Sequence, residues 1–224
     1  INNNYFPNLL FFGPPGTGKT TTIITLIKAY QQKYDQQNKE LVIHLNASDE
    51  RGVDIIRNQI SQFVNSKTLF KKGLKFVILD EVDYMTKNAQ QALKYLLQSC
   101  SKSVRFCLIC NYVSRIDEGL QNDFLRLKFN QLPKLAIHDF LRHISDSENL
   151  GMENDTLVSI QRLYKSDMRS MINFMQSNQN IITDELMIIQ DSIWEELFNI
   201  LNREKITDVP LAFISHISNQ YNID

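Results

Sequence analysis

The residues that could do chemistry begin where a short apolar run near the start of the chain ends. Residues 9–12 lead directly into Gly13-Pro14-Pro15-Gly16-Thr17-Gly18-Lys19-Thr20, followed by Thr21. The three glycines let the backbone turn so that successive N–H groups point inward, which forms a cradle for phosphate oxygens. Lys19 adds a positive charge for β- and γ-phosphates, and Thr20 offers a hydroxyl to Mg²⁺. The spacing therefore predicts a loop that binds the phosphates of a nucleotide.

Two further apolar runs end in polar side chains. Residues 75–80 finish with Asp80, and Glu81 follows directly. We expect Asp80 to hold the water shell of Mg²⁺ and Glu81 to act as general base for an attacking water. Asn111 ends the run 105–111 and could hold this water or contact the γ-phosphate, or it could only cap a turn. The adjacent carboxylates, without the Asn-Lys-x-Asp motif of GTPases, predict ATP hydrolysis.

The elements that must position these groups alternate along the first 130 residues. Strand-like runs and helical patterns follow one another at 9–12, 19–34, 40–46, 53–64, 75–80, 87–98, 105–111 and 125–129. This alternation predicts an α/β fold in which helices cover both faces of a five-stranded parallel sheet. Ligands bind such sheets at the carboxyl ends of the strands. Every motif above falls at such an end.

After Pro133 the pattern is helical throughout. Helices are expected at 134–146, 154–164, 168–178, 186–203 and 208–221. We therefore expect a nucleotide-binding core over residues 1–132, a small helical domain over 133–182, and the beginning of a further helical domain over 183–224.

Composition narrows the function classes. The 224 residues carry a net charge of −1, so any DNA contact needs a local basic patch. No apolar run approaches the roughly 20 residues that span a bilayer, so we expect no membrane partner.

Cys107 and Cys110 lie three residues apart in a strand, which places their thiols on opposite faces. We expect buried small hydrophobic residues there rather than a metal or redox pair, and we assign no chemistry to the four histidines.

Five segments together resemble the small subunits of replication factor C, the AAA+ clamp loader of eukaryotic and archaeal DNA replication. They are residues 13–20, 45–57, 78–97, 105–116 and 166–177. Residues 66–73 and the CNYVSRI segment bring the chain nearest to the third-position eukaryotic small subunit. The resemblance implies an AAA+ ATPase that uses ATP and Mg²⁺ within a nuclear heteropentamer of replication factor C subunits. It would load a sliding clamp onto primer–template DNA. Residues 133–182 would be the lid and 183–224 the start of the collar.

The resemblance also implies roles for single residues. Asn111 would be sensor 1, and Arg169 would be sensor 2, which reaches the γ-phosphate from the lid. Asn46 would be the switch residue that holds Glu81 inactive until DNA arrives. The arginines expected to touch the DNA backbone are Arg51, Arg57 and Arg115. Judged without the family, these three arginines are interpreted as a solvated charged face.

Two features depart from the family. Its Ser-Arg-Cys triplet, whose arginine enters a neighbouring subunit's ATP site as a finger, is replaced by Asn122-Asp123-Phe124. A carboxylate repels a phosphoryl transition state, so this subunit lacks a finger unless Arg115 or Arg126 substitutes for it. Only twelve residues precede Gly13 and the collar stops after about two helices, so we expect a fragment.

Two rival functions stay open. One is another AAA+ DNA motor, such as a branch-migration helicase, which would show DNA-stimulated ATPase activity without any need for a clamp. The other is a nucleotide-locked scaffold subunit that binds ATP and assembles but barely hydrolyses it. The replaced finger favours the scaffold, and the intact Glu81 argues against it.

Overall fold

The computed structural model describes residues 5–48, 55–66, 73–100, 103–179, 191–203 and 208–221. It divides into two compact units, residues 1–131 and residues 132–224. The first unit contains the sheet, and the second is built from helices wherever the structure describes it.

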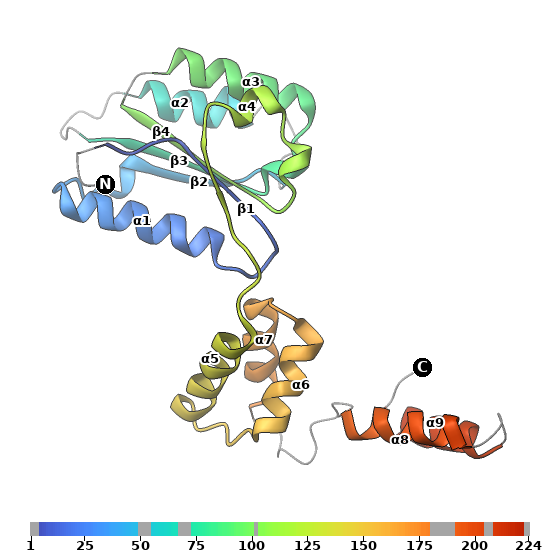
Figure 1. Ribbon diagram of the computed structural model, residues 1–224. Coiled ribbons are helices and arrows are strands. Elements are labelled where there is room, and N and C mark those ends of the chain that lie inside the picture. Colours follow the sequence, from blue (N-terminus) through green and yellow to red (C-terminus); the bar gives the residue numbers. More distant parts are fainter. Residues whose placement is uncertain are drawn as a thin grey trace. The chain divides into compact units, whose positions relative to one another are not determined.

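The first unit is an α/β layer structure. Its strands are β1 (Leu9–Phe12), β2 (Val42–Asn46), β3 (Lys75–Asp80), β4 (Val104–Cys110) and β5 (Leu125–Lys128). They lie in the order β2-β3-β4-β1-β5, and every neighbouring pair is parallel. One face is covered by α1 (Lys19–Lys33), and the other by α2 (Ser61–Asn65), α3 (Lys87–Ser99) and α4 (Glu118–Gln121) (Figure 1). The predicted five-stranded parallel sheet with helices on both faces is confirmed.

The central strands are buried on both faces, so alternate residues enter two different cores. Toward α3, side chains such as Val77, Leu79 and Leu108 form one core. Toward α1, Phe76 and Ile78 join the other core with Phe6 and the α1 residues Ile23, Ile27 and Tyr30. This two-residue period explains why the strands read as continuous apolar runs.

The two cysteines of β4 follow the same period. Cys107 lies in the core that contains α1 and Cys110 in the core that contains α3. The prediction that their thiols face opposite sides of the sheet is confirmed. Burial raises the pKa of both thiols to about 12, and the carboxylates of Asp83 and Asp80 act in the same direction on Cys110. Both cysteines therefore pack as neutral side chains.

Two elements of the first unit differ from the predictions by more than a single residue at one end. The strand predicted at 40–46 begins at Val42, because a 3₁₀ turn (Lys39–Leu41) precedes it and the Asn38 side chain caps that turn by accepting from the N–H of Glu40. The helix predicted at 53–64 contains a π-helical turn over Ile55–Ile60 before α2 begins. A buried lysine, Lys75, closes the carboxyl end of α2 by donating to the carbonyl oxygens of Phe63, Val64 and the C-cap residue Ser66.

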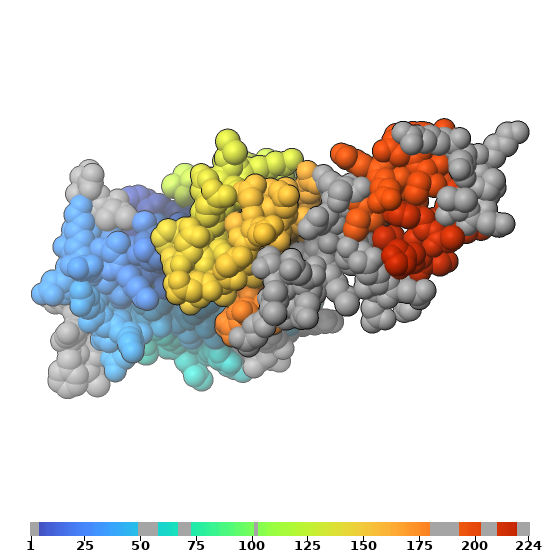
Figure 2. Space-filling view, turned by 90° about the horizontal axis from the view of Figure 1, so that it is seen from below, coloured from blue at the N-terminus to red at the C-terminus, as the bar shows by residue number. Residues whose placement is uncertain are grey.

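The second unit begins with three helices, α5 (Lys134–Ser147), α6 (Asn154–Tyr164) and α7 (Met168–Ser177). They share a core formed by Ile137, Leu141, Leu157, Ile160, Met171 and Met175. Two further helices, α8 (Asp191–Arg203) and α9 (Asp208–Tyr221), pack against each other and form the red surface in Figure 2. The first residues of the helix predicted at 186–203 lie outside the described residues. No helix in the described ranges is long and apolar enough to cross a membrane.

Candidate nucleotide site

The phosphate-binding octet forms a turn that demands glycine at its start. Gly13 has φ 145°, and a Cβ built there would lie 2.0 Å from the carbonyl oxygen of Phe129. Gly16 and Gly18 also have positive φ, of 69° and 86°. The Thr17 hydroxyl donates to the carbonyl oxygen of Pro14 over 2.8 Å, which ties the loop to itself. The loop thus combines backbone conformations that favour glycine with a hydrogen bond of its own.

Helix α1 begins directly after this loop and offers its amino end to an anion. Gly18 is the N-cap residue, no side chain caps the helix, and its first turn contains no acidic residue. The N–H groups of a first helical turn have no acceptors within the helix, and the helix dipole adds partial positive charge there. This end of α1 is therefore suited to phosphate binding.

Lys19 joins the loop to β4. It is 7% exposed, and its ammonium donates to the carbonyl oxygens of Gly13 and Pro14 over 2.8 and 2.7 Å. The same ammonium donates to Oδ1 of Asn111 over 3.0 Å. Two residues that lie 92 positions apart, both predicted to face the γ-phosphate, are thus in direct contact.

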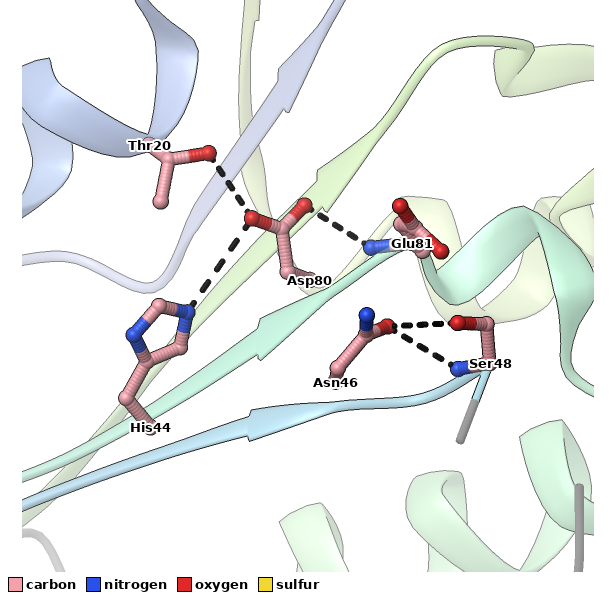
Figure 3. A network of polar contacts seen from close by, with 6 residues as sticks. All are labelled: Thr20, His44, Asn46, Ser48, Asp80 and Glu81. Atoms are coloured by element: carbon pink, nitrogen blue, oxygen red, sulfur yellow. Dashed lines mark hydrogen bonds and ion pairs between the residues drawn. The ribbon is translucent and has the colours of Figure 1, made fainter. Parts of the chain in front are cut away.

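The predicted metal ligands also meet. The Thr20 hydroxyl donates to Oδ2 of Asp80 over 2.7 Å, and Oδ1 of Asp80 accepts from the N–H of Glu81 over 2.9 Å (Figure 3). A hydroxyl and a carboxylate are hard oxygen donors of the kind that Mg²⁺ prefers. The two groups fit a Mg²⁺ ion that is otherwise held by water and phosphate oxygens. Over the residues that the structure describes, no group of three or more His, Cys, Asp or Glu side chains could hold a metal alone.

Glu81 occupies an unusual backbone position. Its φ of 56° and ψ of 36° lie in the left-handed region, at the start of a 3₁₀ turn over Val82–Tyr84. An L-residue with a Cβ pays a steric cost there. The turn ends β3 abruptly and leaves the Glu81 side chain only partly buried beside Asp80.

Asn46 lies at the end of β2, paired in register with Asp80. Its Oδ1 accepts from both the N–H and the hydroxyl of Ser48 over 3.0 Å (Figure 3). Both Asn46 and Glu81 are described, and no hydrogen bond joins their side chains. The structure thus brings the two residues to the same end of the sheet and directs the amide oxygen toward Ser48.

The predicted arginines lie in different places. Arg169 is exposed in the first turn of α7, where the Asp167 carboxylate caps the helix by accepting from the N–H groups of Arg169 and Ser170. Arg115 is exposed at the end of a 3₁₀ turn that follows β4. Arg51 and the side chain of Arg57 lie outside the described residues.

Two residues of the segment that replaces the family's finger triplet, Asn122 and Asp123, are exposed, and the third, Phe124, is buried. Asp123 follows α4 and faces solvent. Arg126, on the edge strand β5, is also exposed and donates to Oε1 of Gln121 over 3.2 Å. Gln121 itself is buried and donates to the carbonyl oxygens of Val113 and Ile116.

Three polar residues near the site escaped the sequence analysis. The Nε2 atom of His44 lies 4.0 Å from Oδ2 of Asp80 (Figure 3). The signal was its position two residues before Asn46, since alternate residues of a strand share a face. The Asp83 carboxylate is 5% exposed and accepts from the N–H of Tyr112 over 3.3 Å, and the buried amide of Gln90 links two turns. Neither contact has a signal in local sequence.

Comparison with known proteins places this site in context. The family model for ATPases associated with various cellular activities (AAA) matches residues 9–131. The chain is similar to human replication factor C subunit 5, with 43% identity over 79% of this chain and 52% of that protein. It is similar to replication factor C subunit 3 of Schizosaccharomyces pombe, with 40% identity over 79% of this chain and 51% of that protein. The resemblance predicted from the motifs is confirmed. The chain spans about half the length of these relatives.

Solved structures share the fold. The Aeropyrum pernix Orc1 protein in complex with DNA matches with a TM-score of 0.63 at 16% identity, over 79% of this chain and 55% of that chain. A RuvB mutant of Thermotoga maritima matches with a TM-score of 0.57 at 11% identity, over 98% of this chain and 65% of that chain. Identities this low bear on the fold alone.

Proposed function

This chain belongs to the AAA family of ATPases, and from that membership we propose that it is an ATP-hydrolysing small subunit of a replication factor C-type clamp loader. The observation that carries the proposal is the pair of contacts between loop and strand ends. The Lys19 ammonium contacts Asn111 while the Thr20 hydroxyl contacts Asp80. The groups that bind phosphate and metal thus converge from three elements, as hydrolysis of ATP requires.

The phosphates of ATP would be held by the loop from Gly13 to Thr21 and the amino end of α1. Thr20 and Asp80 would hold Mg²⁺, whose positive charge would offset the negative charge of the phosphate oxygens. Lys19 adds a fixed charge beside the same oxygens. These assignments use backbone N–H groups, one ammonium and two hard oxygen donors, all on neighbouring elements.

The remaining groups act on the attacking water. Glu81 would accept its proton as general base, and Asn111 would orient it through the amide that also contacts Lys19. Arg169 is assigned to the γ-phosphate from the helical unit, and Asn46 to restraint of Glu81, on the resemblance to the clamp-loader family. Arg51, Arg57 and Arg115 are assigned to the DNA backbone on the same ground.

The proposed partners follow from the relatives' assembly. The chain would join other replication factor C subunits in a heteropentamer in the nucleus and act on a sliding clamp and primer–template DNA. The exposed apolar side chains Trp194, Phe198, Leu201 and Leu211 of α8 and α9 support a role of this region in subunit contacts.

The test is steady-state ATPase activity of the full-length chain co-expressed with the other loader subunits. We expect primed DNA and clamp together to raise turnover above that of the complex alone. Stimulation by DNA that is indifferent to the clamp would instead favour another AAA+ DNA motor. ATP binding without turnover at this subunit's site would favour the nucleotide-locked scaffold.

A further inference from the structure

Three exposed side chains gather where the turns after β3 and β4 meet. The guanidinium carbon of Arg115 lies over the ring of Tyr112, 5.0 Å from its centroid, and over the ring of Tyr84, 5.9 Å from its centroid. Tyr84 and Tyr112 keep 51% and 57% of their surface exposed. A cation over the face of an aromatic ring is attracted by the ring's quadrupole. Arg115 is therefore held by two rings while its side chain stays exposed.

Buried polar side chains fix the backbone of both turns. The Asp83 carboxylate accepts from the N–H of Tyr112, which ties the turn after β3 to the turn after β4. The buried Gln90 side chain donates to the carbonyl oxygens of Met85 and Arg115 over 3.3 and 3.0 Å. Tyr84 and Arg115 thus start from backbone positions that are joined by hydrogen bonds. The ring contacts are a built feature rather than the chance meeting of long side chains.

An arginine held in this way has a particular chemical use. An exposed arginine ordinarily loses much rotamer freedom when it binds, and that loss weakens the contact. Rings that stack on the guanidinium leave its in-plane N–H donors available, and those donors match the oxygens of a phosphate. The arrangement is suited to a phosphate diester that approaches the edge of the guanidinium.

We propose that Tyr84 and Tyr112 are positioning residues that hold Arg115 ready for a backbone phosphate of primer–template DNA. The proposal rests on the proposed function, from which the phosphate contact of Arg115 comes. The new element is the role of the two rings, which hold the arginine in place. The rings themselves are not proposed to contact the bases.

The test measures binding of primed DNA to the assembled complex by fluorescence anisotropy at several salt concentrations. Arg115→Ala should weaken binding and lower the slope of log Kd against log salt by about one. Tyr84→Leu and Tyr112→Leu should each weaken binding about twofold to fivefold with the slope unchanged, because the charge remains but is no longer held. Tyr84→Phe and Tyr112→Phe keep the rings and should bind as the wild type does. Tyr95→Leu, which replaces another exposed tyrosine, on α3, is the matched control.

A double-mutant cycle separates positioning from direct contact. In the Arg115→Ala background, Tyr84→Leu should have no further effect. An equal loss of affinity in both backgrounds would mean that the ring itself binds DNA. No loss of affinity in the wild-type background would mean that the ring contacts do not contribute to DNA binding. Either result overturns the proposal while the proposed function stands. A wild-type complex that fails to bind primed DNA would overturn both.

Discussion

The phosphate end of the first unit and the segment 118–128 differ in how their charged groups are engaged. At the phosphate end, Lys19 is buried against three oxygen acceptors and Asp80 accepts from Thr20 and Glu81. In the other segment Asp123 faces solvent, and Arg126 donates to a single glutamine oxygen from an exposed edge strand. Under the proposed function, the chain keeps the groups for its own ATP, whereas the group proposed to serve a neighbour's ATP is replaced. A domain of this fold can thus keep the residues of its own proposed nucleotide site and still lack the residue that would complete the site of a neighbour.

The strongest challenge to the complete half of this comparison is Glu81→Gln. We expect hydrolysis at this subunit's site to fall by about 10²–10⁴-fold with ATP still bound, because an amide can hydrogen-bond water but cannot take its proton. Single-turnover hydrolysis in the assembled complex measures the effect. Glu148→Gln, an exposed glutamate beyond α5, is the matched control. A wild-type rate in the Glu81 variant would mean that the base lies elsewhere.

Lys19→Ala tests the loop itself. We expect ATP affinity to fall by about 10²-fold, since a hydrogen bond to a charged group contributes roughly 1.5–3 kcal/mol. Calorimetric titration of the assembled complex measures it, with Lys28→Ala on the exposed side of the same helix as control. Unchanged ATP affinity would mean that the loop is not the nucleotide site. The contrast between the phosphate end and the segment 118–128 would then also fail.

Asp123→Arg tests the incomplete half. Arginine fingers contribute about 10³–10⁵ in rate in other phosphoryl-transfer systems, and a finger restored by one substitution should recover at least about tenfold at the neighbouring site. ATPase activity of the complex measures the gain, and Asn122→Arg places the same charge one residue away as control. If Asp123→Arg changes nothing while Arg126→Ala abolishes turnover at the neighbouring site, the finger is Arg126 on β5. The chain would then still supply an arginine to the neighbouring ATP site.

The smallest effect concerns packing beside the site, where Cys110 directly precedes Asn111. At pH 8 the folded chain should leave Cys107 and Cys110 unalkylated by iodoacetamide, because their pKa of about 12 keeps them neutral. Raised pKa values mean that the folded chain binds more protons than the unfolded chain between about pH 9 and 12. Stability should therefore decrease as the pH rises above about 9. Mass spectrometry with and without urea reports the alkylation, and rapid native labelling of Cys110 would contradict tight packing there.

Much of the fold could be predicted because local sequence determined it. The bounds of β1 and β3 were predicted correctly, since a strand buried on both faces is a continuous apolar run bounded by glycine or charge. The loop, Asp80, Glu81 and Asn111 were assigned to the site because each lies at the end of such a strand. The start of β2 was wrong because the side chain of Asn38 stabilises a competing turn. Local sequence decides such turns less clearly than it decides buried strands.

What escaped prediction depends on register between distant strands. His44 approaches Asp80 only because β2 pairs with β3 in one particular register. The ring contacts of Arg115 require the turns after β3 and β4 to meet, and these turns are about thirty residues apart in the chain. Their hydrogen bonds come from Asp83 and Gln90, which look like ordinary helix and turn residues in sequence.

The left-handed backbone at Glu81 places thermal robustness and catalysis in opposition at one position. For a residue with a Cβ this conformation is less favourable by roughly 1–2 kcal/mol of free energy, whereas glycine adopts it at almost no cost. A library of variants selected only for resistance to heat would therefore favour glycine at the position where the proposed mechanism needs a carboxylate. Selection for growth would remove the same substitution. The frequency of glycine at position 81 after each selection would compare the stability lost at this position with the proposed catalytic role of Glu81.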